Sequence, residues 1–344
     1  MGDRFRDLLD RVGGALTGRG PHHLEEEEAE WAFGRLLSGE VSLVRATAFL
    51  LALRAKGPTP EELSGCARAA RSRIRFPELP PGTVVLSTSR RGKRRSPPLG
   101  LAAAAAASAC GVPVLVLAPP GTAGGGTTLG DVWVEAGGGL RAAPEAVAAA
   151  LRADGFAVWC PSEADPGWHP LQEIEEDLGL RLLPDVVAKL LLPEGCPVMV
   201  AAMHGPVLGR AGDALQRLGH PRGLILQGVE GSLDPALSRT TRGLWLADGH
   251  SGPLRIRPED LGLGPQEEPA LAEGAEPARA ALNATRRAFL GRPAAEALVA
   301  ALGAACILSL AREVATLAEA LAEALDALDT GAAEHRFQAA LGRS

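Results

Sequence analysis

A cluster of cations follows the first β-prone segment of the chain. Five of the six residues from 90 to 95 are basic, and three small hydroxyl residues precede them. The segment comprises Ser87, Thr88, Ser89, Arg90, Arg91, Gly92, Lys93, Arg94 and Arg95. Guanidinium and ammonium groups neutralise phosphates, and a strand-to-helix turn lies where an α/β sheet opens its ligand crevice. The segment is a candidate site for a phosphate-bearing ligand or a nucleic-acid backbone, and its alternative is a solvated loop.

Two further places could contribute to such a site. Gly121 begins a glycine-rich run after the second β-prone segment, where backbone amides could surround a phosphate or simply form a flexible turn. His204 follows a later strand, at a position suited to an acid–base or phosphate-binding group. Because no nucleophile pattern accompanies His204, an imidazole bonded to the backbone is the simpler interpretation.

Glu230 and Asp234 are the remaining acids that could hold a cation, and Gln227 and Gly228 precede them in the same segment. Two carboxylates at this spacing are common in loops, so the sequence predicts no metal site here. The five cysteines are scattered without a CxxC pair, which predicts neither a disulfide framework nor zinc binding. The sequence alone therefore assigns no catalytic residue.

Composition limits the classes of function. Hydrophobic residues make up 46% of the 344 residues and charged residues 22%, which is typical of a globular protein. The net charge of -6 argues against attraction of nucleic acid by the whole surface and leaves only local binding. The apolar stretch 101–118 is broken at Gly111 and Pro113, so we expect no membrane span. With no signal-peptide pattern and scattered cysteines, a cytoplasmic location is expected.

Hydrophobic periodicity predicts a helical head over residues 1–78 and an α/β domain over 79–344, with residues from about 165 to 195 contributing to the head. Thr59, Pro60 and Glu62 form a helix start with a capping box. The α/β domain is predicted to contain a mainly parallel sheet flanked by helices, followed by a loop over 248–277 and three final helical stretches. The expected strands are 83–87, 112–117, 157–159, 198–202 and 223–227, and the expected helices are 25–37, 42–55, 99–109, 206–218, 278–290, 294–310 and 311–328.

The head resembles the N-terminal helical domain of anthranilate phosphoribosyltransferases, a domain shared with pyrimidine nucleoside phosphorylases. The match lies in residues 36–41 (LLSGEV) and 48–63 (AFLLALRAKGPTPEEL). It continues in residues 178–181 (LGLR), 190–193 (LLLP) and 228–234 (GVEGSLD), so the resemblance spans nearly the whole chain. The chain is thus identified as a member of glycosyltransferase family 3, with the nucleoside phosphorylase and phosphoribosyltransferase type of fold.

The resemblance implies a site for 5-phosphoribosyl pyrophosphate and Mg²⁺, but the family's residues are altered. The basic segment 87–95 stands where the family has Gly-Thr-Gly-Gly-Asp, and 117–122 (LAPPGT) stands where it has Lys-His-Gly-Asn-Arg. Asp234 remains, but Pro235 replaces the acid beside it and Gln227 replaces a histidine. Glu175 stands where an arginine would pair with the anthranilate carboxylate. Tryptophan biosynthesis is therefore not expected.

Within the superfamily the chain is similar to the YbiB-type proteins, which carry a basic turn after the first strand and a Gly-Val-Glu-Gly-Ser segment like residues 228–232. That resemblance implies a homodimer formed through the helical head, and nucleic-acid binding without biosynthetic activity. Three hypotheses remain open. The chain is a degenerate relative that binds a phosphate-bearing ligand or nucleic acid, an active phosphoribosyltransferase with an unknown acceptor, or a scaffold. A cofactor, Mg²⁺ with phosphoribosyl pyrophosphate, is expected only for the active enzyme.

Overall fold

The computed structural model describes residues 3–14, 20–122, 125–203, 207–264, 266–272, 274–312 and 316–343. The chain divides into two compact units. Unit 1 comprises Met1–Arg75, Pro161–Leu192 and Asp213–Gly219, and unit 2 comprises Phe76–Cys160, Pro193–Gly212 and His220–Ser344. The domain boundary expected after residue 78 stays a prediction.

Unit 1 is helical. Its α4 begins as the sequence predicts, since the Thr59 side chain accepts a hydrogen bond from the Glu62 amide while the Glu62 carboxylate accepts one from the Thr59 amide. Glu62 is fully buried, where it also accepts from the Leu24 amide at 2.8 Å and pairs with the buried Lys56. The helices are α1 (Arg4–Gly13), α2 (Glu26–Leu37), α3 (Leu43–Lys56), α4 (Pro60–Arg71), η1 (Pro161–Ala164), α8 (Trp168–Asp177) and α9 (Leu183–Ala188).

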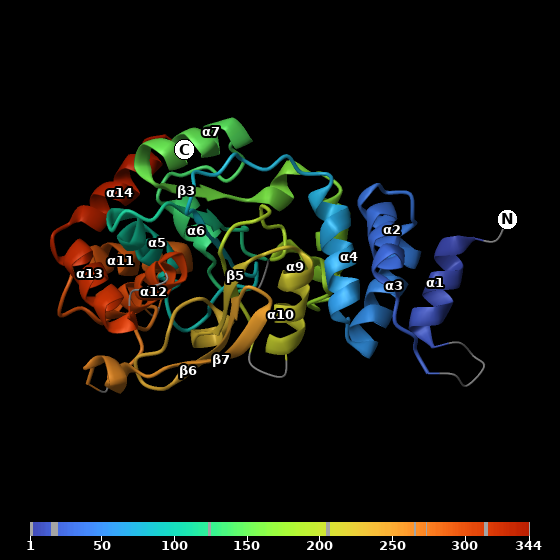
Figure 1. Cartoon of the computed structure of the whole chain (residues 1–344). Helices are drawn as coiled ribbons and strands as arrows, with labels where there is room; N and C mark the ends of the chain where they lie inside the picture. Colours follow the sequence, from blue (N-terminus) through green and yellow to red (C-terminus); the bar gives the residue numbers. More distant parts are fainter. Residues whose placement is uncertain are drawn as a thin grey trace. The chain divides into compact units, whose positions relative to one another are not determined.

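Within the described residues, unit 2 contains a seven-stranded sheet with the order β3-β2-β1-β4-β5-β6-β7. Figure 1 labels β3, β5, β6 and β7 of this sheet. The five strands from β3 to β5 are parallel, and β6 and β7 are antiparallel to their neighbours. This confirms the predicted fold class, because parallel strands joined by helices form a mainly parallel α/β sheet. The strands are β1 (Val84–Ser87), β2 (Val114–Leu117), β3 (Phe156–Trp159), β4 (Val198–Ala201), β5 (Arg222–Gln227), β6 (Thr241–Ala247) and β7 (His250–Ile256).

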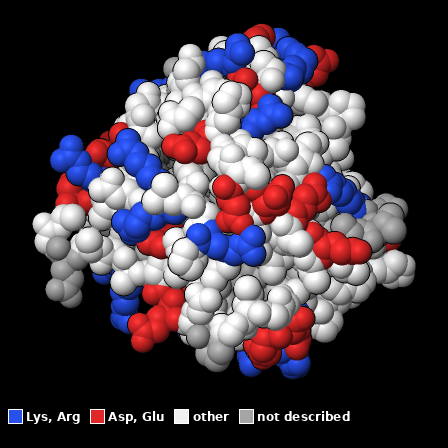
Figure 2. Space-filling model, turned by 90° about the vertical axis from the view of Figure 1, so that its left-hand side faces the viewer, with Lys and Arg blue, Asp and Glu red and all other residues white. Residues whose placement is uncertain are grey.

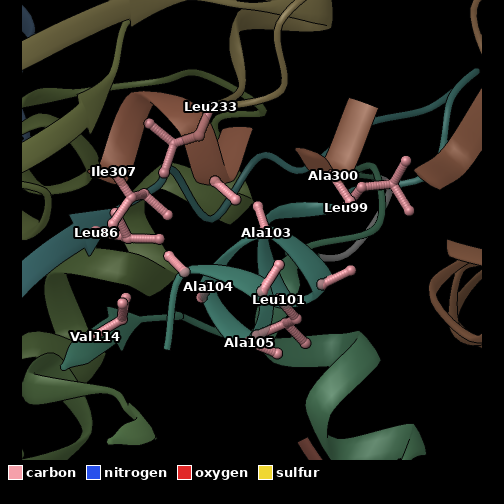
Figure 3. Close-up of a cluster of buried hydrophobic side chains, with 14 of the residues drawn as sticks. Leu86, Leu99, Leu101, Ala103, Ala104, Ala105, Val114, Leu233, Ala300 and Ile307 are labelled. Atoms are coloured by element: carbon pink, nitrogen blue, oxygen red, sulfur yellow. The ribbon is translucent and has the colours of Figure 1, made fainter. Parts of the chain in front are cut away.

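The main core of unit 2 forms around two alanine-rich helices. The helix α5 (Gly100–Ala109) is buried from Gly100 to Ser108, and it packs against α12 (Ala295–Ala311). Small side chains allow this approach, since a Cβ added at Gly303 of α12 would lie 2.9 Å from the Cβ of Ala103. Figure 3 shows side chains from β1, α5 and α12 gathered in one apolar cluster. This core fixes the amino end of α5 beside the carboxyl end of β1.

The remaining elements of unit 2 surround this core. Helices α13 and α14 both contact α5, and α7 and α14 contact β3. Within the described part of the chain no helix is both long and apolar enough to cross a membrane. The other elements are α6 (Leu129–Glu135), α7 (Pro144–Asp154), α10 (Leu208–Arg217, which both units share), η2 (Val229–Gly231), η3 (Pro258–Leu261), α11 (Pro277–Phe289), α13 (Leu317–Asp329) and α14 (Ala332–Leu341).

Two local predictions were wrong. The segment 248–277 was expected to be a loop, but β7 occupies its beginning and forms a hairpin with β6. The reason is the sheet edge: β7 pairs on one side only, so it tolerates Pro253, which lacks an amide proton and weakens the strand signal. The final helical stretch was expected to end at 328, whereas the structure has a turn with Gly331 at positive φ and then α14.

Candidate functional site

A pocket lies at the carboxyl ends of β1, β4 and β5 in unit 2, where the ligand crevice of a parallel sheet is expected. The amino ends of α5 and α6 also reach it, and the positive end of a helix dipole favours negatively charged ligands. Its empty volume is about 480 Å³, part of which is open to solvent. The lining residues are Thr88, Ser89, Arg91, Gly92, Lys93, Pro98, Gly100, Thr127, Thr128, Leu129, Met203, Glu230, Gly231, Ser232, Leu233 and Asp234.

The basic turn, residues 90–95, is held against the glycine-rich run by backbone hydrogen bonds. The Lys93 amide donates to the Thr127 carbonyl at 2.9 Å, the Thr127 amide donates back at 2.7 Å, and the Gly126 amide donates to the Arg91 carbonyl at 2.7 Å. A Cβ at Gly126 would lie 2.4 Å from the Lys93 backbone, so only glycine allows this approach. The described part of the run therefore supports the basic turn.

Lys93 and Asp234 form a buried ion pair at the base of the pocket. The Lys93 Nζ lies 2.7 Å from the Asp234 Oδ2 and also donates to the Pro97 carbonyl at 3.0 Å. The Asp234 carboxylate accepts in addition from the Leu99 amide, at 3.2 and 3.3 Å. Both side chains are about 95% buried. The acid that the resemblance assigns to Mg²⁺ thus already has a cation and an amide as partners.

Glu230 is engaged in a comparable way. Its carboxylate accepts hydrogen bonds from the amides of Arg94 at 2.8 Å, Arg95 at 3.2 Å and Ser96 at 2.9 Å, and from the Ser96 hydroxyl at 2.7 Å. Burial raises the pKa of Glu230, but the bonds from Ser96 and the neighbouring amides outweigh it and leave the pKa below its usual value. Glu230 therefore stays ionised at neutral pH.

The backbone of Glu230 has φ 57°, in the left-handed region. Among the described residues other than glycine, only Glu230 and Asp248 have positive φ. Such a conformation costs a side-chain-bearing residue about 1–2 kcal/mol. The carboxylate interactions of Glu230 offset this cost.

The residues present do not fit a divalent cation. A magnesium ion needs free carboxylate oxygens, but those of Asp234 and Glu230 face protein donors. Elsewhere in the described chain, histidine, cysteine and acidic side chains nowhere gather in a group of three suited to a metal. The site as built presents cations and amides rather than metal ligands.

The structure separates the predicted basic residues into three groups. Arg90 and Lys93 are buried, Arg91 is half-buried in the pocket, and Arg94 and Arg95 are exposed. Arg94 and Arg95 line a neighbouring groove together with Lys93. Thr88, Ser89, Gly92, Glu230 and Asp234 line the pocket itself, as predicted residues brought together from two distant segments. Ser87 is buried in β1 and outside the lining.

Three other predicted residues have structural contacts and do not line the pocket. The Gly121 amide donates to Asp131 at 2.9 Å, and the Gln227 Nε2 donates to the Met203 carbonyl at 2.9 Å. Gly228 permits a tight loop, since a Cβ there would lie 2.4 Å from the Asp234 carbonyl oxygen. His204 lies outside the described residues.

Sequence reasoning placed Thr127 and Thr128 in the glycine-rich run that begins at Gly121, and both line the pocket. Thr128 also carries a readable signal, because Thr128 and Asp131 form the capping box at the start of α6. Met203 was missed, since neither its residue type nor its spacing marks it. It enters the pocket through the sheet topology.

The fold and the pocket define a class of protein: a helical unit with an α/β unit whose pocket opens at the carboxyl ends of parallel strands. Two family models match the chain. "Glycosyl transferase family, helical bundle domain" matches residues 13–74, and "Glycosyl transferase family, a/b domain" matches residues 96–334. The chain belongs to this family and is similar to its anthranilate phosphoribosyltransferases. The family inferred from sequence is thereby confirmed, whereas the YbiB-type subgroup stays a prediction.

Relatives in sequence cover nearly the whole chain. The anthranilate phosphoribosyltransferase of Methylobacterium nodulans is 31% identical over 336 residues, which is 96% of each protein. That of Desulfitobacterium hafniense strain DCB-2 is 30% identical over 316 residues, or 90% of this chain and 92% of the relative.

Solved structures are also similar to nearly the whole chain. The anthranilate phosphoribosyltransferase of Thermus thermophilus superposes with a TM-score of 0.84 at 26% identity, covering 99% of each chain. The Saccharomyces cerevisiae enzyme, in complex with PRPP and Mg, superposes with a TM-score of 0.80 over 98% of each chain. Its identity of 15% supports the fold alone.

Proposed function

We propose that the chain binds a phosphate-bearing ligand in the pocket of unit 2 and does not transfer a phosphoribosyl group to anthranilate. The ion pair between Lys93 and Asp234 carries this proposal. The Lys93 ammonium already satisfies the Asp234 carboxylate that a divalent ion would need as a ligand, so phosphate binding in this pocket should not depend on Mg²⁺. The helix amino ends and Arg91 add further attraction for an anion.

The surroundings of Glu175 also argue against anthranilate as acceptor. Glu175 is buried in unit 1, where it accepts hydrogen bonds from the Leu182 amide at 2.7 Å and the Asp185 amide at 3.3 Å. The carboxylate that replaces the family's arginine is thus used to fix the start of α9. It offers no cation to a carboxylate substrate.

A second candidate is an active phosphoribosyltransferase with an unknown acceptor, using Mg²⁺ and phosphoribosyl pyrophosphate. The sequence relatives favour this candidate over loss of activity, because enzymes 30–31% identical cover 90–96% of the chain. The packing around Asp234 favours the first candidate. The two differ in whether pyrophosphate is released from the donor.

One experiment separates them. Phosphoribosyl pyrophosphate and Mg²⁺ are incubated with the protein, with and without anthranilate, and pyrophosphate release is measured beside calorimetric binding of pyrophosphate with Mg²⁺ or EDTA. We expect binding that EDTA leaves intact and no release. Steady release of pyrophosphate would show that the protein is an active transferase. If the protein neither releases nor binds pyrophosphate, the scaffold hypothesis remains. The Arg91→Ala variant is expected to weaken binding, whereas Arg239→Ala, an exposed arginine outside the pocket, is the matched control.

A more specific form of this proposal is that the phosphate-bearing ligand is a nucleic acid. Burial of Arg90 and Lys93 leaves Arg91, Arg94 and Arg95 of the basic turn to meet a phosphate backbone. On the face in Figure 2, basic and acidic side chains alternate, which supports local rather than general attraction. Three phosphate contacts give a slope of log affinity against log salt of about -2.7 on duplex DNA. Fluorescence anisotropy of a labelled nucleic acid at several salt concentrations tests this slope. Unchanged binding by an Arg94→Ala, Arg95→Ala double variant would exclude the basic turn as the nucleic-acid-binding surface.

Homodimer formation through unit 1 is also proposed from the resemblance. At the start of α3, Leu43 is 56% exposed and Val44 is 80% exposed, which leaves an apolar surface for a second copy to cover. Light scattering of a Val44→Glu variant tests this, and we expect a shift from dimer to monomer. A cytoplasmic location stays a prediction.

A further inference from the structure

Three consecutive backbone amides and one hydroxyl surround a single carboxylate in unit 2. The amides belong to Arg94, Arg95 and Ser96, the hydroxyl to Ser96, and the carboxylate to Glu230. Successive amides that point to one spot form an anion-binding nest, and such nests bind phosphate groups. We call this set of four donors the amide nest. Its present occupant comes from a residue more than 130 positions away in sequence.

We propose that the amide nest is a binding site for a phosphoryl group and that Glu230 occupies it as an internal competitor. The inference rests on the proposed function and deepens it. A carboxylate and a phosphoryl group both present negatively charged oxygens to N–H donors. An inorganic phosphate, or the terminal phosphoryl group of a larger ligand, enters the nest when the Glu230 side chain leaves it.

The surroundings allow this exchange. Glu230 and Lys93 both line the pocket, so a ligand in the pocket lies next to the nest. Arg94 and Arg95 are exposed and line the adjoining groove, where they add positive charge. The left-handed backbone of Glu230 is a strained conformation that persists only where surrounding contacts hold it, and both the nest donors and the turn from Gly228 to Gly231 do so.

The sharpest variant is Glu230→Gly. Glycine adopts a φ of 57° without steric cost, so this change removes the carboxylate and preserves the loop. Loss of an internal competitor raises the apparent affinity by the inverse of the fraction of molecules with an open site, and we expect a gain of about tenfold or more for inorganic phosphate. Glu230→Gln keeps the length of the side chain without its charge and is expected to give a smaller gain.

Asp248→Gly is the matched control, because Asp248 also has positive φ but lies in the turn between β6 and β7. It reports the effect of relieving backbone strain alone. Binding of inorganic phosphate and pyrophosphate is measured by calorimetry for all variants. Hydrogen exchange of the amides of residues 94–96 is measured in parallel, and thermal unfolding verifies that each variant is folded.

The expected result has two parts. In Glu230→Gly the amides of the nest exchange faster than in the parent protein, and phosphate restores their protection. If folded Glu230→Gly and Glu230→Gln both bind phosphate no better than the parent, Glu230 is only a structural link and the inference is wrong. The proposed function fails separately: it is wrong if the parent protein binds no phosphate, whereas binding by Glu230→Gly alone would still support the competitor.

Discussion

The Lys93 Nζ lies 2.7 Å from the Asp234 Oδ2, and this ion pair joins the turn after β1 to the loop after β5 across 141 residues of sequence. Both groups are removed from water, so each depends on the other for its charge to be compensated. The pair thus determines two properties at once: the position of the basic turn and the electrostatics of the pocket base.

Removing one partner of this pair should be costly. We expect Asp234→Asn to lower the free energy of unfolding by about 3–5 kcal/mol, because it leaves the Lys93 charge buried without its counter-ion. The double variant Lys93→Met, Asp234→Leu should be close to the parent protein. Urea unfolding of the singles and the double measures the coupling, and equal losses in the single and double variants would contradict it.

The close approach of Gly126 to Lys93 should tolerate no side chain. We expect Gly126→Ala to lower the free energy of unfolding by about 2–3 kcal/mol and to weaken phosphate binding, since its Cβ overlaps the Lys93 backbone. Gly209→Ala is the control: nothing lies within 4 Å of its added Cβ, and alanine stabilises a helix by about 0.5–1 kcal/mol relative to glycine. Denaturant unfolding and calorimetry check both effects.

Glu62 should be among the most sensitive residues of unit 1. Glu62→Ala removes the partner of the buried Lys56 and the acceptor for the Leu24 and Thr59 amides, so we expect a loss of about 3–5 kcal/mol. Glu27→Ala, on the exposed surface of α2, should change stability by less than about 0.5 kcal/mol. A similar loss in both variants, measured by chemical unfolding, would show that burial is not the cause.

Lys189 should make stability depend on pH. Burial, and secondarily the Arg181 guanidinium, lowers its pKa to about 7. Between this value and the ordinary pKa near 10.5, the unfolded chain binds more protons than the native one, so the free energy of unfolding rises with pH. Relative to Lys189→Met, we expect the parent protein to gain about 1–2 kcal/mol from about pH 7 to about pH 8.5. Urea unfolding at the two pH values tests this, and a constant difference would contradict it.

The fold could be predicted from sequence where local signals agree with the final packing. Thr59 and Glu62 mark a helix start by their chemistry alone, and the structure has that start. The five parallel strands are short apolar runs between helical segments, and each was recognised within two residues. The hairpin of β6 and β7 was missed because Gly243 and Pro253 interrupt the pattern. The sheet edge explains why Pro253 is tolerated in β7, whereas Gly243 permits the close approach of β6 to β5, since a Cβ there would lie 2.4 Å from the Ile225 carbonyl oxygen.

The site could be predicted only in outline. The sequence placed the basic turn and the segment around Glu230 and Asp234 among the candidates, and both line one pocket. It could not show that Asp234 compensates the charge of Lys93, because the two residues lie 141 positions apart and are brought together only by the order of the strands in the sheet. For the same reason, the count of basic residues overstated the exposed positive charge: Arg90 is 6% exposed and Lys93 is 3% exposed.

The links from Glu230 to the amides of residues 94–96 bear on the order of events during folding. They close chain loops of 134–136 residues, within which β2, β3, β4 and β5 all lie. Contacts of such long range form only after the intervening strands have assembled, because loop closure is entropically costly. Pulse labelling during refolding should therefore find these amides protected later than those of α5, so newly made chains assemble the parallel strands of the sheet before they acquire a pocket.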